Sequence, residues 1–508
     1  MVLTQRRRDY ESVIRIGERL LEARPQSPSI LGELTPALVR MGRAKDALER
    51  IDEYDRAYGA PIDLLERGMN IASRHASAEA AAHWLERVLA RDPKSTVGLL
   101  QDYNRHTWNG DYEAAANAVL SIEFRANKPL RPVYSAVFRA IRSDEIEHAV
   151  SLLEDMEGAK ALHFERKLIS AVLAISRRDL AGAEKLVSEA AADAQSDRRL
   201  AVVLSLLAEA YSADDGSQDH TKTAKFAAWA DDEFTKPIPT ASQTVICKAR
   251  EKLDTILATP KSQRLLQDQP AMVSFICPVH RSRDVKNLVD QLQRQKWTNA
   301  EAVFYPNGEV TREQILHHWD QNSEIEPVFV DSGNPTNVGG FLNEILAACK
   351  GDYLCRIDAD CWYLPNYTGH MICCLEHARA DVIAIASMIR LLEELDVATL
   401  NPFGPILEPV EFRSGGGGAT FLFHRRVIEK CKFPLMRAGE DTAFLAASQK
   451  AGFKAFYGAP FNFVAVRAAD KDLHTWNVPD VQILFQGKEE LIRNGEDLAK
   501  FVQHPSQE

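Results

Sequence analysis

The spacing of apolar residues differs between the two halves of the chain. Through residues 1–258 apolar residues recur at intervals of three and four among many Ala, Leu, Glu and Arg residues, which is typical of amphipathic helices. From residue 271 onward, short apolar runs alternate with longer segments of helical spacing. The pattern predicts an all-helical region over 1–258, a linker over 259–270 and an α/β domain over 271–480.

The helical region contains an internal repeat. Six small or apolar residues stand 34 positions apart: Val13, Ala47, Ala81, Ala115, Ala149 and Ala183. Pro25 and Pro93 each follow one of them by twelve residues and predict helix ends. This period resembles the tetratricopeptide repeat (TPR), and residues 110–115 are the nearest match to its inter-helix turn. The phase breaks after Tyr211, so we expect one further helix pair to close the region at Ala258.

A TPR-like solenoid has an extended concave surface that commonly holds a peptide or partner protein. We therefore expect a protein partner, or a protein or glycan acceptor, at this region. A spacer or a dimerisation surface is the alternative.

The second half predicts alternating strands and helices. The expected strands are 272–278, 301–305, 327–330 and 353–357, and the expected helices between them are 285–295 and 341–349. This alternation implies a largely parallel sheet with right-handed crossovers. Residues 481–508 predict a C-terminal helical tail, with an amphipathic pattern over 489–502, that packs on the α/β domain.

Composition narrows the function classes. The 508 residues carry a formal charge of −11, which argues against nucleic acid as a partner and against a broadly basic membrane-binding face. The N-terminus has no signal-peptide core and no apolar run approaches about 20 residues. We expect a cytoplasmic protein without a transmembrane segment. The eight cysteines begin at Cys247, form no Cys-x-x-Cys pair and are expected to be reduced core residues.

Two aspartates follow the predicted strand 353–357. Asp358 and Asp360 stand one residue apart, and Pro365 prevents a longer strand. In an open α/β sheet, ligands bind at the carboxyl ends of the strands. Paired carboxylates there are suited to a divalent cation together with a diphosphate.

Several motifs occur together with these aspartates. In order they are Pro278, Asn337-x-Gly339, Asn343, Gly351-Asp352-Tyr353, Asp358-x-Asp360, Pro365, the glycines 415–418 and Gly439-Glu440-Asp441-Thr442. Their order and spacing over residues 271–476 resemble the GT-A glycosyltransferases of family 2.

The resemblance implies a role for each matching residue. Asp358 and Asp360 would hold the ribose and a Mn²⁺ or Mg²⁺ ion that bridges the diphosphate of a nucleotide sugar. Asp441 would be the general base that deprotonates the acceptor hydroxyl, with Glu440 as the alternative base. His474 lies where related enzymes place a histidine near the metal or diphosphate. The reaction would be an in-line displacement that inverts the anomeric carbon.

The same resemblance predicts the nucleotide-sugar site. Its expected residues are Pro278, His280, Arg281, Asn307, Asn337, Asn343, Asp358, Gly416 and Gly417. The second strand of the family commonly ends in two aspartates, whereas here Pro306, Asn307 and Gly308 follow Tyr305. Asn307 both donates and accepts hydrogen bonds, which remains compatible with a UDP-sugar.

Three functions fit these patterns. The first is a metal-dependent inverting glycosyltransferase whose solenoid presents a protein acceptor or docks the enzyme at a surface glycan. The second is an inactive GT-A scaffold in which the solenoid is the working protein-binding module. The third is a nucleotidyltransferase, although residues 278–283 lack the glycines expected of a triphosphate loop. Asp358, Asp360 and Asp441 favour the first function, because an inactive site has no physical need for three carboxylates in a cleft.

Overall fold

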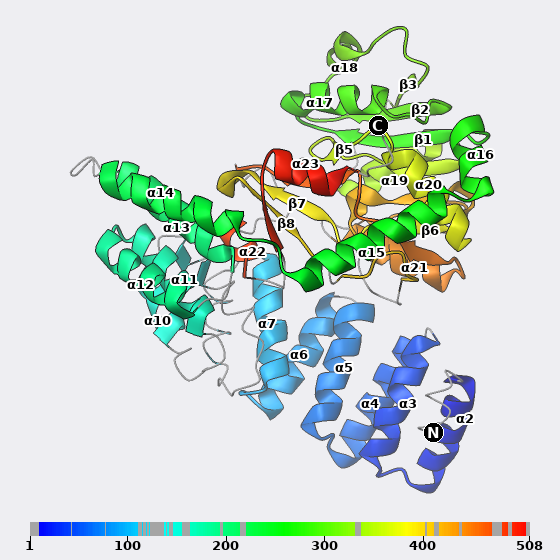
Figure 1. Ribbon diagram of the computed structural model, residues 1–508. Helices are drawn as coiled ribbons and strands as arrows, with labels where there is room; N and C mark the ends of the chain where they lie inside the picture. Colours follow the sequence, from blue (N-terminus) through cyan, green and yellow to red (C-terminus); the bar gives the residue numbers. More distant parts are fainter. Residues whose placement is uncertain are drawn as a thin grey trace. The chain divides into compact units, whose positions relative to one another are not determined.

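The chain forms two compact units, residues 1–179 and residues 180–508 (Figure 1). The computed structural model describes residues 10–503 apart from 42, 77, 110–113, 115–117, 119–120, 122–136, 139, 142–145, 155–162, 194–196, 214–219, 331–336, 402–403, 411–415, 436–438, 470–479 and 486–489. The predicted order of a helical region followed by an α/β domain is confirmed. The division at Asp179 precedes the predicted boundary at 258, because the last helices group with the α/β domain.

The first unit is helical wherever it is described as regular structure. Its longer helices are α2 (Tyr10–Ala23), α3 (Pro28–Arg40), α4 (Ala44–Tyr58), α5 (Ile62–His75), α6 (Ala78–Arg91), α7 (Thr96–Asn109), α10 (Ile146–Glu154) and α11 (His163–Ser176). The starts of α2, α4 and α6 are 34 residues apart, and Val13 and Ala47 are fully buried at the same position of their helices. The predicted helix-pair period is therefore confirmed. Ala115 and the turn at 110–113 lie outside the described residues, and the TPR resemblance stays a prediction.

Glycines in this unit differ in the space around them. A Cβ added to Gly68 on α5 would lie 2.3 Å from the ring of Trp84, a buried residue on α6. A Cβ added to Gly32 on α3 would meet only the Arg67 guanidinium, at 3.9 Å. The close approach of α5 and α6 therefore depends on Gly68, whereas Gly32 has room for a side chain.

The second unit begins with helices that belong to the α/β domain. They are α12 (Leu180–Asp193), α13 (Arg199–Ser212), α14 (His220–Thr235), α15 (Thr240–Leu257) and α16 (Pro260–Asp268). The predicted closing pair to Ala258 is found as α14 and α15. The linker predicted over 259–270 is wrong, because the Thr259 side chain caps helix α16 with Pro260 in its first turn. Lys261 on this helix forms an ion pair with Glu376 of the domain at 2.7 Å.

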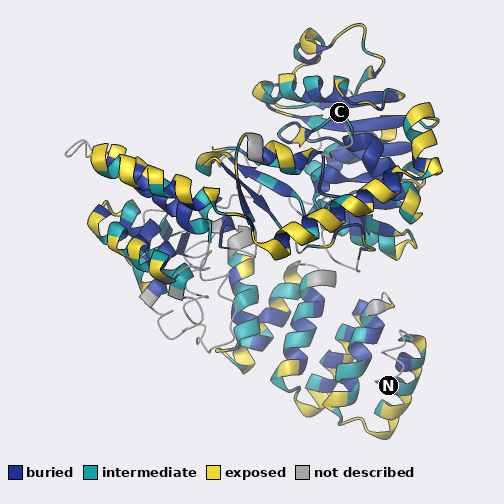
Figure 2. Ribbon diagram, in the orientation of Figure 1, coloured by how far each residue is buried: buried dark blue, intermediate teal, exposed yellow. Residues whose placement is uncertain are grey.

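A seven-stranded sheet forms the centre of the domain. Its order is β10 (Ala455–Tyr457), β6 (Val382–Ala384), β9 (Leu422–His424), β4 (Tyr353–Arg356), β1 (Val273–Val279), β2 (Ala300–Pro306) and β3 (Glu326–Phe329). Only β9 runs antiparallel to its neighbours, so the predicted largely parallel sheet is confirmed. The central strands are buried (Figure 2). The connecting helices are α17 (Ser282–Gln293), α18 (Arg312–His318), α19 (Val338–Ala348), α20 (Tyr367–Ala378) and α21 (Glu440–Lys450).

A second sheet was not predicted from the sequence. Its order is β12 (Glu490–Arg493), β8 (Val397–Leu400), β7 (Ile389–Leu392), β11 (Phe463–Arg467) and β5 (Trp362–Tyr363). Helix α22 (Asp480–Ile483) precedes β12, and α23 (Glu496–Val502) follows it. The all-helical tail is therefore wrong for residues 490–493, which pair with β8, and right for 496–502.

The tail joins the closing helices to this second sheet. Arg198 at the start of α13 donates a 2.8 Å hydrogen bond to the Leu491 carbonyl, and Ser242 of α15 donates to the Glu490 carboxylate. Arg250 of α15 donates to the Lys500 carbonyl. The predicted packing of the tail on the domain is confirmed. The same hydrogen bonds hold α13 and α15 against the tail.

An ion-pair network lies at the amino end of β4. Glu376 accepts hydrogen bonds from the Tyr353 hydroxyl at 2.8 Å and from Lys261, and it lies 3.3 Å from His424. The contact with His424 lowers the pKa of Glu376; burial opposes that shift, whereas Lys261 and Tyr353 reinforce it. This network joins α16 and α20 to the amino end of β4, whereas the paired aspartates follow its carboxyl end.

Two further expectations concern cysteines and membranes. All eight cysteines are free of disulfides and seven are buried, so the core assignment is confirmed except for the exposed Cys247. Among the residues that the structure describes, no helix has both the length and the apolar content needed to cross a bilayer.

Candidate functional site

The paired aspartates lie at the carboxyl edge of the seven-stranded sheet. β4 ends at Arg356 beside the parallel strand β1, and Asp358 and Asp360 follow in the next turn. The Tyr363 hydroxyl accepts a hydrogen bond from the Asp358 backbone N–H at 3.0 Å and donates one to the Ala419 carbonyl at 2.7 Å. Tyr363, buried on β5, therefore fixes the aspartate turn against the glycine-rich segment.

Arg356 connects the aspartates to helix α21. Its Nε and Nη2 donate to the two carboxylate oxygens of Asp358 at 2.7 and 3.1 Å, and its Nη1 lies 3.5 Å from Oε1 of Glu440. Burial lowers the pKa of this guanidinium, but the carboxylates of Asp358, Glu440 and Asp441 outweigh burial and raise that pKa above its ordinary value. Sequence analysis missed Arg356. Its position two residues before Asp358, on the same face of an extended chain, was the available signal.

The residues after β1 and β2 meet beside the aspartates. Arg281 is buried and donates to Oδ2 of Asp360 at 2.8 Å, and its Nε lies 2.6 Å from Asp284. The Asn307 backbone donates to the Val279 carbonyl, and the Gly308 position lies against the His280 backbone. Burial, and then the charge of Arg281, lower the pKa of His280 and favour its neutral form. The structure thus brings His280, Arg281 and Asn307 together.

Helix α21 places the two candidate bases differently. Glu440 is buried and contacts Arg356, whereas Asp441 is only partly buried. Asp441 accepts hydrogen bonds from the backbone N–H of Gly418 at 3.2 Å and of Thr442 at 2.6 Å. These bonds hold the Asp441 carboxylate beside the glycine-rich segment.

The glycines fit closely against the protein itself. A Cβ on Gly416 would lie 2.7 Å from the Ala384 side chain, and one on Gly417 would lie 2.2 Å from the Met388 side chain. These two glycines therefore pack against the end of β6 and the chain that follows it. Their expected approach to a donor stays a prediction.

Three other predicted donor-site residues make structural contacts. The Asn337 side chain caps α19 by accepting from the Gly340 N–H at 2.9 Å. The Asn343 amide exchanges two 2.9 Å hydrogen bonds with the Phe433 backbone. Pro278 lies within β1, opposite Tyr305 of β2. Roles of these residues in donor binding remain predictions.

The two aspartate carboxylates suit a cation that binds together with a substrate. Among the described residues, no group of three or more His, Cys, Asp and Glu side chains is gathered as a metal cage. Asp358 and Asp360 supply two carboxylates, and Mg²⁺ is commonly held by one or two carboxylates plus substrate phosphates. Asp358 and Asp360 therefore fit the expected Mn²⁺ or Mg²⁺ ion. His474 lies outside the described residues.

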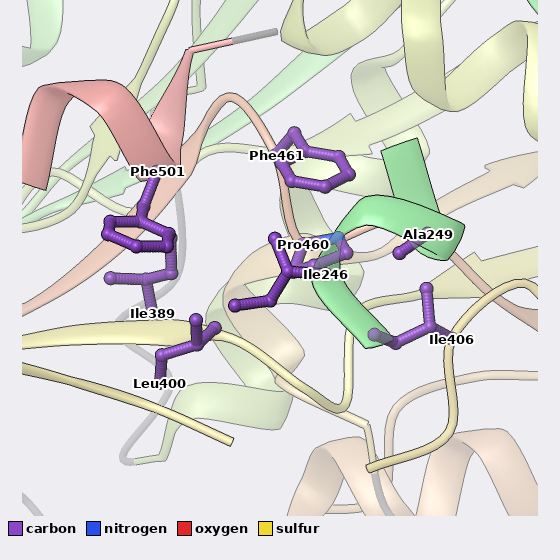
Figure 3. A pocket seen from close by; sticks show the side chains of 8 residues that line it. All are labelled: Ile246, Ala249, Ile389, Leu400, Ile406, Pro460, Phe461 and Phe501. Atoms are coloured by element: carbon purple, nitrogen blue, oxygen red, sulfur yellow. The ribbon is translucent and has the colours of Figure 1, made fainter. Parts of the chain in front are cut away.

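The cavity in Figure 3 is not this site. It is a small hollow of about 10 Å³ between α15, the second sheet and α23. Its lining is apolar and consists of Ile246, Ala249, Ile389, Leu400, Ile406, Pro460, Phe461 and Phe501. Such a lining offers no charged group to a diphosphate, so the carboxyl edge of the first sheet is the better candidate.

Comparison with known proteins identifies the segment around this edge. The profile described as glycosyl transferase family 2 matches residues 274–416, and no curated protein matches the chain. The structure of S. aureus TarS 1-349 is 15% identical, with a TM-score of 0.31 over 38% of this chain and 60% of that chain. The mannosyltransferase PcManGT from Pyrobaculum calidifontis, solved in complex with GDP-Man and Mn²⁺, is 14% identical, with a TM-score of 0.33 over 45% of this chain and 66% of that one. The chain thus spans less than two thirds of either structure. Residues 274–416, which include Asp358 and Asp360, form a glycosyltransferase family 2 domain.

Proposed function

We propose that this protein transfers a sugar from a nucleotide-diphospho-sugar, a UDP-sugar in the first instance, to a hydroxyl acceptor with inversion at the anomeric carbon. One observation carries the proposal. The paired aspartates of a family 2 domain are joined, through Arg356 and Tyr363, to the glycine-rich segment and the helix that carries Asp441. Donor-binding and base carboxylates at one sheet edge are what such a displacement needs.

The donor is held at the aspartate turn. Asp358 and Asp360 would hold Mn²⁺ or Mg²⁺ together with the diphosphate, and His280, Arg281 and Asn307 would contact the nucleotide. The cation, when bound, offsets the negative charge that develops on the departing nucleoside diphosphate. The positive charge of Arg281, beside Asp360, adds to that stabilisation.

Asp441 is the general base. It takes the proton of the acceptor hydroxyl as the new glycosidic bond forms, while the bond from the anomeric carbon to the diphosphate breaks. Two observations support Asp441 over Glu440. Asp441 is the more exposed carboxylate, and Glu440 is buried against a cationic partner.

Calorimetric titration with UDP, GDP and CDP, each with Mn²⁺ and with chelator, tests the donor half of the proposal. We expect one nucleotide to bind in a metal-dependent manner, and Asp360→Ala to weaken that binding by about tenfold or more. If none of the three nucleotides binds, the α/β domain is not a working transferase and the scaffold function replaces this one.

Asp441→Asn tests the base. The substitution preserves size and removes the proton acceptor, so turnover should fall about 10²- to 10⁴-fold while nucleotide affinity is retained. Glu440→Gln is the matched control on the same helix. If Glu440→Gln abolishes turnover and Asp441→Asn does not, the two roles must be exchanged.

For the helical repeats we propose a recruiting role. A surface of stacked helix pairs supports binding of a protein or glycan acceptor. Comparing transfer to that acceptor by the full chain and by residues 180–508 measures this role. Loss of transfer with nucleotide binding intact supports recruitment, and equal transfer contradicts it.

A further inference from the structure

One buried guanidinium faces carboxylates from both halves of the proposed site. Arg356 is 8% exposed and closes β4, whereas Glu440 and Asp441 open α21. The charged groups around Arg356 are Asp358, Glu440 and Asp441. Burying an arginine costs free energy unless its N–H groups have hydrogen-bond partners. Here the partners are carboxylates that are proposed to bind the nucleotide sugar and to take the acceptor proton.

The three guanidinium nitrogens of Arg356 have different partners. Nε and Nη2 form a fork on Asp358 at 2.7 and 3.1 Å, which fixes the plane of that carboxylate. Nη1 points to Glu440 instead, at 3.5 Å. One planar group thus contacts both elements at once, which the point charge of a lysine does not reproduce.

Asp441 shares the same surroundings. The point where a Gly418 Cβ would stand is 3.0 Å from Nη1 of Arg356 and 3.1 Å from Oδ2 of Asp441. The distance between Nη1 of Arg356 and Oδ2 of Asp441 therefore cannot exceed the sum of these two distances. Asp441 therefore lies near the guanidinium that contacts Asp358 and Glu440.

We propose that Arg356 is a positioning residue of the transfer reaction. It sets the separation between the donor carboxylate Asp358 and the start of α21, and it occupies Glu440 as a counter-ion so that Asp441 is the carboxylate left to take the acceptor proton. This inference rests on the proposed function.

The test uses the full chain with two variants, Arg356→Gln and Arg356→Lys. The probes are UDP-glucose, UDP-N-acetylglucosamine and GDP-mannose with Mn²⁺, and the assay follows release of nucleoside diphosphate with water as acceptor. Arg356→Lys keeps the charge and loses the fork, so kcat should fall about tenfold or more. Arg356→Gln loses both, and its kcat should fall at least as far. Parental kcat in both variants overturns the inference.

A second measurement does not depend on turnover. Both variants should bind UDP or GDP about tenfold more weakly than the parent, because Asp358 loses its fork. Unchanged affinity also overturns the inference. Glu376→Gln is the control, because it breaks an ion-pair network at the opposite end of β4 and should lower stability without changing kcat or the nucleotide affinity.

Different results would contradict the proposed function and the positioning role of Arg356. If the parent protein neither binds a nucleotide nor releases one, the proposed function fails and this inference fails with it. If the parent does both and the Arg356 variants match it, only the positioning role is wrong.

Discussion

Gly418 offers a direct test of how closely the two halves of the site must approach. Gly418 lies in a single turn of 3-10 helix, so alanine meets no backbone strain there. The added Cβ would stand 2.8 Å from Cβ of Asp441 and 3.0 Å from Nη1 of Arg356. Ordinary contacts between carbon atoms are about 3.5–4.0 Å. Asp441 must therefore move by several tenths of an ångström or more, because its Cβ is fixed to the helix backbone.

The expected cost follows from that displacement. Overpacking of this kind destabilises a fold by about 1–3 kcal/mol. A base displaced by up to about 1 Å can lose about 10²-fold in rate, so turnover of Gly418→Ala should fall by roughly that factor while nucleotide affinity falls much less. The assay is release of nucleoside diphosphate, together with calorimetric binding of the nucleotide and thermal unfolding.

A matched variant separates strain from chemistry. In Gly369→Ala the added Cβ would stand 2.7 Å from a methyl group of Leu266, at the contact between α20 and α16. Because that methyl group ends a half-buried side chain that can move, this substitution should cost no more stability than Gly418→Ala and leave turnover of the folded protein unchanged. If Gly418→Ala keeps the parental turnover, Asp441 does not need its present position and is not the base.

Three further predictions concern stability and boundaries. Because the pKa of Glu376 is lowered in the folded state, its network stabilises the fold above the ordinary value of 4.5, and this stabilisation is lost as the pH falls below it. Glu376→Gln should therefore cost roughly 1–3 kcal/mol at pH 7 and flatten the acid side of the stability profile; a parallel profile would contradict this. Gly68→Ala should destabilise the repeats by about 1–3 kcal/mol, whereas Gly32→Ala should stabilise them by up to about 1 kcal/mol, as measured by urea unfolding. Residues 180–508 should fold cooperatively and residues 271–508 should not, and a stable 271–508 fragment would show that α13 and α15 are dispensable.

The sequence predicted those parts of the fold whose signals are local. The 34-residue spacing of small residues predicted the period of the helix pairs, and the helix starts at Tyr10, Ala44 and Ala78 confirm it, because each helix pair packs on the next in the same way. Strands β1 to β4 were also predicted, because strands covered on both faces are short apolar runs. The errors at 259–270 and 490–493 have different causes. Thr259 and Pro260 form a helix N-cap and first turn that the sequence already shows, whereas residues 490–493 form a strand because they pair with β8.

The candidate site divides in the same way. Asp358, Asp360 and Asp441 were predicted because paired carboxylates and a Gly-Glu-Asp motif are visible in the sequence, and their roles stay predictions. Arg356 was missed, since it stands in an apolar strand and only the tertiary structure brings Glu440, 84 positions later, to its guanidinium.

By itself the sequence determined the helical repeats, the first four strands and which residue types are available for chemistry at the ends of those strands. The tertiary structure alone decided which carboxylate is tied to a cation, which is more exposed, and which glycines face backbone or side chain. The physical reason is the separation in sequence over which each kind of interaction acts. Hydrophobic periodicity and turn chemistry act between near neighbours in sequence, whereas charge pairing, burial and close packing depend on groups that only folding brings within a few ångströms of one another.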